Sequence, residues 1–320
     1  MNKLKKVGLT ALGTSLIATS AFAGDVTVTG SAGITLENKN NTDVGNSFSM
    51  TDQVVFAGSG ELDNGMTVSL SLQLDGNIMD DRSVTMEMPE MGTLVFAGHG
   101  GSSAMSAVDD VTPTAYEESW GVIGSTAETT AGRASMENAI GGYATDNNFF
   151  YTAPEMVEGL AVKASYTPSG TSRPDGTVSF NLEYTGIDGL TVGYAEDDNG
   201  LSGTSKIEND TAYIKYAFGS FTVGLQESSQ EQSGGTASDD EYSAVGVSYQ
   251  VSDDVSISYN TSERDFGDKT SDQENEAFNI SYTTGGVTVS AAMAEVKNVG
   301  GSANAQDDIE GFEIDISFAF

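Results

Sequence analysis

The chain has 320 residues, with 13 Lys and Arg against 47 Asp and Glu, and its formal net charge is −34. This acidity argues against nucleic acid as a partner, because contacts with phosphates need clustered Lys and Arg side chains. The chain has no Cys, which excludes disulfides and thiol chemistry.

The first segment, residues 1–23, is predicted to be a secretory signal peptide. It has a positive start with Lys3, Lys5 and Lys6, a mostly apolar stretch over 7–18, and a small-x-small cleavage site that ends at Ala23. The apolar stretch is shorter than the ~20 residues that a membrane-spanning helix needs. Cleavage near Ala23 would remove three lysines and change the net charge from −34 to −37.

Beyond this segment, polar and apolar residues alternate with a period of two. The pattern is clearest over 66–74 and recurs over 160–166, 178–184, 212–218 and 255–260. Such alternation predicts β-strands. No later stretch reaches the ~18 apolar residues of a membrane helix. A membrane location would therefore leave a closed barrel as the only fold that satisfies every backbone group.

The connections between these strands differ in length. Short turns are expected at 63–65, 89–92, 153–159, 187–189, 219–220, 252–254 and 284–286. Longer polar segments are expected at 37–46, 75–81, 99–147, 168–176, 196–209, 227–240, 262–275 and 297–309. Fifteen connections predict an all-β, transmembrane antiparallel β-barrel of about 16 strands, formed by residues 24–320 as one domain. The longest segment, 99–147, follows the fifth strand, and loops of this length are usually functional.

Strand parity predicts which charged side chains face the pore lumen. Lys163, Lys215, Glu61 and Glu183 lie on polar strand faces, so we expect them inside the barrel. The same parity assigns Glu37, Glu87, Glu313 and Asp315 to the lumen. Since few bases neutralise these acids, the sequence predicts a negative lumen that prefers cations.

Catalysis is not predicted. His99 is the only histidine, and its position beside Ser102 and Ser103 does not supply the geometry of a catalytic triad. No cofactor is expected, with one weaker alternative. Ca²⁺ could bind the acidic segments Asp197-Asp198-Asn199, Asp239-Asp240-Glu241 and Asp307-Asp308, but none has the spacing of a calcium loop, and solvated loops explain them as well.

Four segments resemble the general porins of Gram-negative bacteria, in particular the alphaproteobacterial type. They are 24–30 (GDVTVTG), 58–68 (GSGELDNGMTV), the long loop after the fifth strand, and 312–320 (FEIDISFAF). The last of these is an apolar stripe that ends on Phe320, and it looks like the signal that the barrel-assembly machinery reads.

This resemblance implies a homotrimer in outer-membrane lipid that lets ions and small hydrophilic solutes diffuse passively. It also implies that the third long loop folds into the lumen and narrows it. The acidic side of that constriction would be Asp109, Asp110, Glu117 and Glu118, set against basic groups on the opposite wall. Only ten Lys and Arg follow the signal segment, so the basic side is sparse.

Two other functions are compatible with the same alternation. A secreted soluble all-β surface protein or adhesin would also alternate, although its strand count, loop lengths and final Phe would be harder to explain. A narrow, substrate-specific channel would share every feature above, because the packing of the long loop sets the bore.

Overall fold

The computed structural model describes residues 26–39, 47–76, 78–122, 139–143, 146–170, 175–233, 239–303 and 308–320. The predicted signal peptide at 1–23 lies outside these residues, as does Asp307 of the acidic segments. Within the described ranges, no helix is long and apolar enough to cross a membrane.

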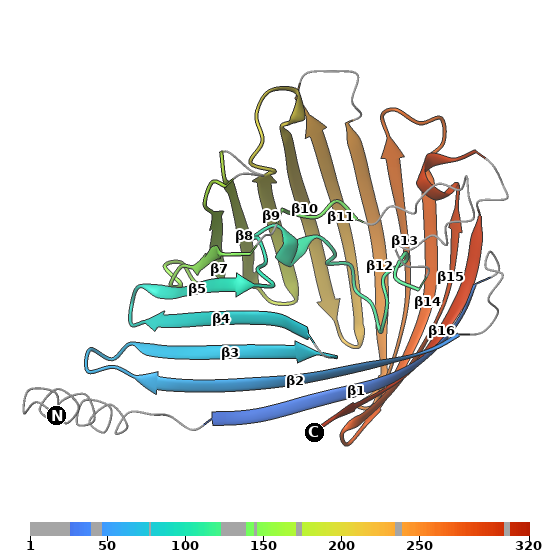
Figure 1. Cartoon of the computed structure of the whole chain (residues 1–320). Helices are drawn as coiled ribbons and strands as arrows, with labels where there is room; N and C mark the ends of the chain where they lie inside the picture. Colours follow the sequence, from blue (N-terminus) through green and yellow to red (C-terminus); the bar gives the residue numbers. More distant parts are fainter. Residues whose placement is uncertain are drawn as a thin grey trace, which may run out of the picture.

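The described residues form sixteen antiparallel strands that close into a barrel (Figure 1). Each strand pairs with the next in the chain, and β1 closes the ring by pairing with β16. Closure leaves no edge strand with unpaired backbone groups. The strands are β1 (Val26–Lys39), β2 (Ser47–Glu61), β3 (Thr67–Asp75), β4 (Ile78–Met88), β5 (Gly92–His99), β6 (Asn148–Thr152), β7 (Leu160–Thr167), β8 (Thr177–Ile187), β9 (Leu190–Asp198), β10 (Ile207–Phe218), β11 (Phe221–Gln232), β12 (Asp240–Ser252), β13 (Val255–Phe266), β14 (Gln273–Thr284), β15 (Val287–Lys297) and β16 (Ile309–Ala319).

The predicted strand number is confirmed, and one predicted loop is wrong. The expected long segment at 75–81 is a strand over most of its length, since only Gly76 and Asn77 separate β3 from β4. Several other long segments are also shorter than expected, such as 199–206 in place of 196–209. The strands continue beyond the alternating sequence because backbone pairing does not require an apolar face.

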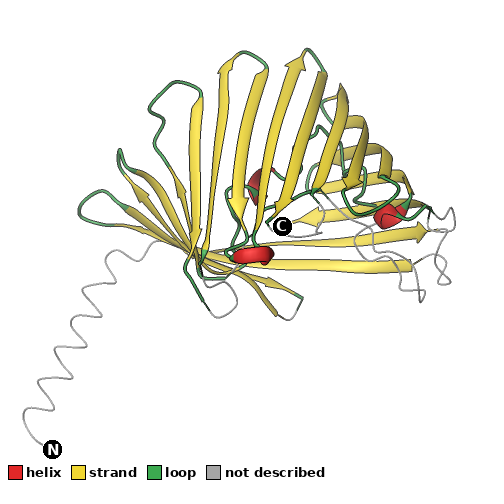
Figure 2. Ribbon diagram, turned by 90° about the horizontal axis from the view of Figure 1, so that it is seen from above, coloured by secondary structure: helices red, strands yellow, loops and turns green. Residues whose placement is uncertain are grey.

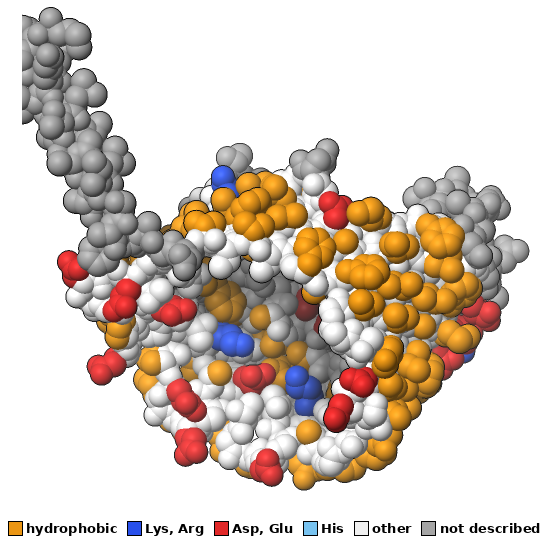
Figure 3. Space-filling view, turned by 90° about the horizontal axis from the view of Figure 1, so that it is seen from below, with side chains coloured by type: hydrophobic (Ala, Val, Ile, Leu, Met, Phe, Trp, Pro, Cys, Tyr) orange, Lys and Arg blue, Asp and Glu red, His pale blue; other side chains and the backbone are white. Residues whose placement is uncertain are grey.

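The outer face of the barrel is apolar. Large side chains such as Leu225 (53% exposed) and Phe278 (49% exposed) point outward, and Figure 3 shows hydrophobic side chains gathered on the outer surface. Such exposure would be costly in water and suits a hydrocarbon surrounding. Near the short-turn end, the rings of Tyr216, Phe218 and Phe221 follow one another at centroid distances of 5.8 and 5.6 Å, as in an aromatic girdle.

The inner face is polar, and on one side of the barrel it is buried. In β9, Gly193, Ala195 and Asp197 are buried, while Tyr194 and Glu196 between them are exposed. The same alternation occurs at the long-loop ends of β8 and β10 to β15. A segment inside the barrel therefore covers the inner face of these strands.

Candidate functional site: the loop inside the barrel

The covering segment is the long connection between β5 and β6, of which residues 100–122, 139–143 and 146–147 are described. Figures 1 and 2 show it inside the barrel rather than above it. Its first part is bonded to β7 and β8: the amide of Ala104 donates to Ser165 Oγ (3.1 Å) and that of Met105 to Ser179 Oγ (2.9 Å). The predicted inward folding is thus confirmed for the described part.

The loop then continues along the inner wall to the last strand. Val111 N donates to Gln226 Oε1 on β11 (2.9 Å), Ala115 N to Ser258 Oγ on β13 (2.8 Å) and Glu117 N to Asn279 Oδ1 on β14 (3.1 Å). The Tyr116 hydroxyl donates to Glu313 on β16. Serine, asparagine and glutamine on the wall thus satisfy the loop backbone strand by strand, which a buried irregular segment requires.

Two apolar clusters attach the loop to this wall. One joins Met105, Val108 and Ile140 of the loop to inward-facing Ala195 and Ala244. The other packs Val122 against wall residues, with Tyr116 and Trp120 beside them; these wall residues are Ala277, Ala292, Ala294, Val296, Val299 and Ile309. Sequence reasoning missed these residues. Their signal was alanine on strand faces that are otherwise polar, which leaves room for a covering segment.

The two ends of the loop are held together at the barrel rim. His99 Nδ1 and Asp146 Oδ1 lie 2.8 Å apart, and the Asn148 amide donates to Ser102 O (2.8 Å). The hydrogen bond from His99 lowers the pKa of Asp146. Ser103 Oγ is 2.9 Å from Ser106 Oγ within the loop. His99 and its neighbouring serines therefore close the base of the loop.

The four predicted acids lie on the inward-folded loop. Burial raises the pKa of Asp109 to about 6 and, together with the charge of neighbouring Glu118, that of Asp110 to about 7. Burial and the charge of Glu118 also raise the pKa of Glu117 to about 7, and burial raises the pKa of Glu118. The acids are close enough to repel one another, so they form one cluster inside the barrel, in which the Asp110 side chain is exposed.

The predicted lumen bases lie on the wall that carries the loop. Lys163 shares the inner face of β7 with Ser165, and Lys215 shares that of β10 with Tyr213. Lys215 Nζ lies 5.7 Å from the centre of the Tyr213 ring, whose hydroxyl donates to Glu183 Oε2 (2.5 Å). Lys163, Lys215 and Glu183 therefore line the lumen together on β7 to β10, and Figure 3 shows charged side chains of both signs within the opening.

The opposite wall, β1 to β5, is rich in hydroxyl groups. Its inward positions are mainly Ser and Thr, including Thr29, Ser31, Ser69 and Thr85. Within the described residues of this wall, Lys39 is the one inward-facing base, and it is paired with Glu37 at 3.2 Å. Glu61 faces inward at the short-turn end of β2, opposite Thr67.

Arg82 is the remaining base of these strands. It pairs with Leu72 and shares the outward parity of Val84. Across the lumen from the loop, the arrangement therefore lacks the basic side that the resemblance implied, as far as the described strands extend.

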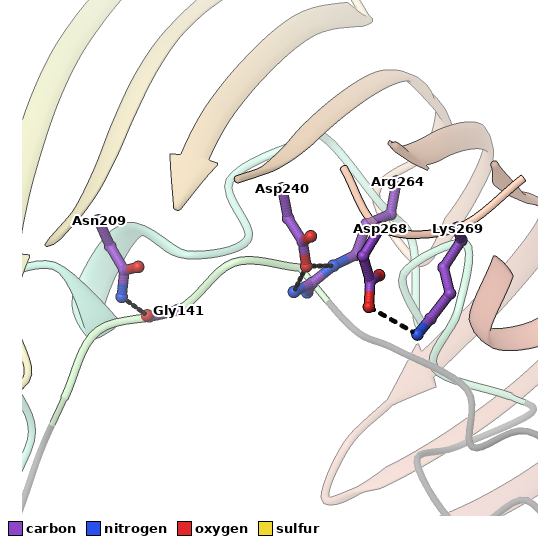
Figure 4. A network of polar contacts seen from close by, with 6 residues as sticks. All are labelled: Gly141, Asn209, Asp240, Arg264, Asp268 and Lys269. Carbon is purple, nitrogen blue, oxygen red and sulfur yellow. Dashed lines mark hydrogen bonds and ion pairs between the residues drawn. The ribbon is translucent and has the colours of Figure 1, made fainter. Parts of the chain in front are cut away.

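A buried ion pair lies inside the barrel, at the long-loop end of β12 and β13. Arg264 Nη2 on β13 is 2.7 Å from Asp240 Oδ2 on β12, and their side chains are 9% and 11% exposed (Figure 4). Nearby, the Asn209 amide donates to Gly141 O of the loop (3.0 Å). Asp240 and Asp197 belong to the acidic segments that were considered as Ca²⁺ ligands. In the structure both contact other residues of the chain: Asp240 forms the ion pair with Arg264, and Asp197 accepts a hydrogen bond from Tyr143 N (2.5 Å). In the part of the chain that the structure describes, no three His, Cys, Asp or Glu are grouped to hold a metal ion.

Known structures share this architecture. An anion-selective porin from Comamonas acidovorans has a TM-score of 0.69 with this chain at 13% identity, covering 93% of this chain and 100% of its own. The outer-membrane protein OmpT of Vibrio cholerae in its trimer form gives 0.66 at 13% identity, with coverage of 93% and 100%. A further porin structure gives 0.66 at 17% identity, with coverage of 92% and 100%. At these identities the likeness shows the fold alone.

The family of the chain is identified from its amino-acid sequence. The comparison with curated proteins finds no significant match. The model of the Gram-negative porin family matches residues 8–301, which is most of the chain. This match confirms the family that the sequence resembles, while the alphaproteobacterial type stays a prediction. The chain therefore belongs to the Gram-negative porin family and is an outer-membrane channel rather than an enzyme.

Proposed function

We propose that this channel passes ions and small hydrophilic solutes by passive diffusion and prefers cations. The observation that carries the proposal is the placement of charge across the lumen. Asp109, Asp110, Glu117 and Glu118 lie on the loop inside the barrel, and the wall of β1 to β5 facing them offers hydroxyl groups instead of free bases. We infer that the narrowest part of the pore lies between these two surfaces.

The selectivity follows from the field of the acid cluster. Charges inside a narrow pore are screened less than charges on an open surface, where the Debye length at physiological salt is ~8 Å. A cation that passes the loop is attracted by carboxylates that no base on the facing wall offsets. Lys163, Lys215 and Glu183 lie on the loop's own wall, so they add a smaller, mixed contribution along the ion path.

The anion-selective relative provides a useful contrast. Its selectivity belongs to that protein, and the shared fold does not transfer it, because selectivity depends on the side chains that line the lumen. A narrow substrate-specific channel remains the alternative within the same fold. It would show saturation of the current by one solute, whereas general diffusion would not.

Charge reversal on the loop tests the proposal. The double variant Glu117→Lys/Glu118→Lys is expected to shift the reversal potential in a salt gradient towards anions, since it replaces two acids of the cluster by bases. The matched control is Glu61→Lys, which changes the charge at the short-turn end of the pore and should shift it less. An unchanged reversal potential in the double variant would contradict a constriction at this loop.

We also infer that three copies assemble through the face formed by β1 to β5. Its outward residues are mostly apolar or small, including Gly30 and Ala32, and the polar exceptions among those described are Asn38, Asp52 and Arg82. The outward faces of β9 to β14 instead carry Tyr194, Tyr216 and Tyr259 and exposed acids near the long-loop end, such as Glu196, Glu241, Glu263 and Glu274. Lipid-facing walls need such aromatic and polar bands, whereas a wall covered by a second copy does not.

Native mass measurement in detergent tests this assembly. A trimer that dissociates in the variant Ala32→Arg, but persists in the variant Val245→Arg on the lipid-facing side, would support assembly through the face of β1 to β5. A wild-type monomer would contradict it. The relative whose structure is described as a trimer form has the same fold.

Export and membrane insertion complete the proposal. Residues 1–23 would direct export and be removed near Ala23. Phe320 is 77% exposed, and its amide donates to Gly30 O (2.9 Å) at the seam between β1 and β16. An exposed aromatic at the closing seam suits recognition by the assembly machinery and contact with outer-membrane lipid. Deletion of Phe320 should lower the yield of folded barrel in cells while leaving refolding in detergent intact.

Passive diffusion needs no cofactor. Binding of Ca²⁺ at the acidic loops stays a prediction, which calorimetric titration of the protein with Ca²⁺ would test.

A further inference from the structure

Two glycines form a gap in the part of the inner wall that the loop covers. Gly224 on β11 and Gly246 on β12 are direct cross-strand partners, and both face inward with Gln226 and Ala244. Neither has the positive φ that would demand glycine for conformational reasons. Glycine weakens a strand, and it often marks a place where another backbone approaches closely.

Pro113 of the loop fills this gap and is itself buried. A Cβ at Gly224 would lie 2.5 Å from Pro113 Cδ and 3.2 Å from its Cγ. A Cβ at Gly246 would lie 2.8 Å from Pro113 O and 3.0 Å from its N. The two glycines thus meet different parts of one residue: Gly224 meets the ring and Gly246 meets the backbone.

The gap lies at the centre of the loop's attachment. On one side Val111 N donates to Gln226 Oε1 (2.9 Å), and on the other Ala115 N donates to Ser258 Oγ (2.8 Å). These two bonds flank Pro113 and hold the loop backbone against the wall on both sides of the gap. Asp110 and Glu117 flank this stretch, and the backbone of Glu117 is itself bonded to Asn279 on β14.

We propose that Gly224, Gly246 and Pro113 are positioning residues that set the distance between the loop and the wall, and hence the bore of the pore. The inference rests on the proposed constriction at this loop. A methyl group added at either glycine fills the gap, and tight packing leaves the rigid proline ring and the loop backbone little room to yield. The loop then moves into the lumen and carries its acids towards β1 to β5.

The experiment compares single-alanine variants in planar bilayers. Gly224→Ala and Gly246→Ala are each expected to lower single-channel conductance while the protein keeps the heat-modifiable gel mobility of a folded barrel. The control is Gly58→Ala on β2, whose added Cβ would lie on the outer face of the barrel in ordinary contact with Val26 Cγ2 at 3.6 Å. This control should conduct like the wild type.

A second substitution separates positioning from a general packing defect. Pro113→Ala removes the ring atoms that Gly224→Ala would meet, so the double variant should regain conductance. The same change leaves the Pro113 backbone in place, so it should not rescue Gly246→Ala. If Gly224→Ala fails to fold, recovery of folding in the double variant Gly224→Ala/Pro113→Ala would likewise show that contact with the proline ring causes the defect.

Several results would overturn the proposal. They are wild-type conductance in both Gly224→Ala and Gly246→Ala, an equal loss of conductance in Gly58→Ala, or equal rescue of Gly224→Ala and Gly246→Ala by Pro113→Ala. Failure of the proposed function looks different, because the wild-type protein would then give no current or prefer anions.

Discussion

At the scale of single residues, the environment of a carboxyl group decides how much charge it contributes. Inside the barrel, Asp110 and Glu117 combine partial burial with the repulsion of neighbouring acids, and both effects disfavour the ionised form. Their positions on the loop are visible in the sequence. Their raised pKa values are not, because these depend on wall strands more than a hundred residues away, such as β11 and β14.

The raised pKa values make selectivity depend on pH. A carboxyl with a pKa of about 7, as for Asp110 and Glu117, is mostly neutral at pH 5 and mostly ionised at pH 8. Cation preference, measured as the reversal potential in a KCl gradient, is therefore expected to rise between these pH values. Replacing the four loop acids by Asn or Gln should flatten this change; a variant with the full wild-type pH response would show that other groups cause it.

The two ion pairs of Figure 4 test burial at the same scale. Arg264→Met leaves Asp240 as a buried charge without that partner, so we expect a loss of about 3–5 kcal/mol in unfolding free energy. Lys269→Met breaks the exposed pair with Asp268 (3.0 Å) and should cost at most about 1 kcal/mol. Denaturant unfolding of the barrel in detergent measures both, and equal losses would contradict the role of burial.

At the scale of elements, strand parity is the property that the sequence predicts best. The alternation over 178–184 and 212–218 assigns Glu183 and Lys215 to the lumen, and the register agrees. Strand ends were predicted less well because β9 to β14 extend into sequence that is polar on both faces, such as Glu196 beside Asp197. There, the loss of alternation marks the end of the lipid-facing band rather than the end of the strand.

Parity can be tested on neighbouring residues of β14. Ile280 faces outward and is 41% exposed, whereas Ser281 faces inward and bonds to Ser290. Ile280→Arg places a charge in lipid and should destabilise the barrel by about 2–4 kcal/mol if the site lies near the bilayer midplane. Ser281→Arg places the same charge in the wet lumen and should cost far less. The unfolding free energies of both variants in lipid vesicles test this assignment. A larger loss in Ser281→Arg than in Ile280→Arg would show that the two strand faces are misassigned.

The path of the loop could not be derived from local sequence. Its length and place after the fifth strand are visible, but its docking depends on residues such as Gly246 and Ala277 that the fold brings together from β12 and β14. These small residues on polar faces look unremarkable one at a time. Their role is clear only when the strand pairing aligns them along the inner wall, as it aligns Gly246, Asn260 and Ala277.

At the scale of the whole molecule, charge and shape agree on one function. A chain of net charge −34 forms a barrel with an apolar outer face and a polar interior, and the acids of its inner loop face a wall of hydroxyl groups. The same fold occurs in an anion-selective porin, whose selectivity belongs to that protein. For this chain we propose that the lining side chains favour cations.

The most direct test is the reversal potential of the wild-type protein in planar bilayers under a KCl gradient at pH 8, where Asp109, Asp110 and Glu117 are mostly ionised. Our interpretation predicts discrete conductance steps and a reversal potential of the sign that cation preference gives. Anion preference under these conditions, or the absence of conducting steps from a folded barrel, would contradict it.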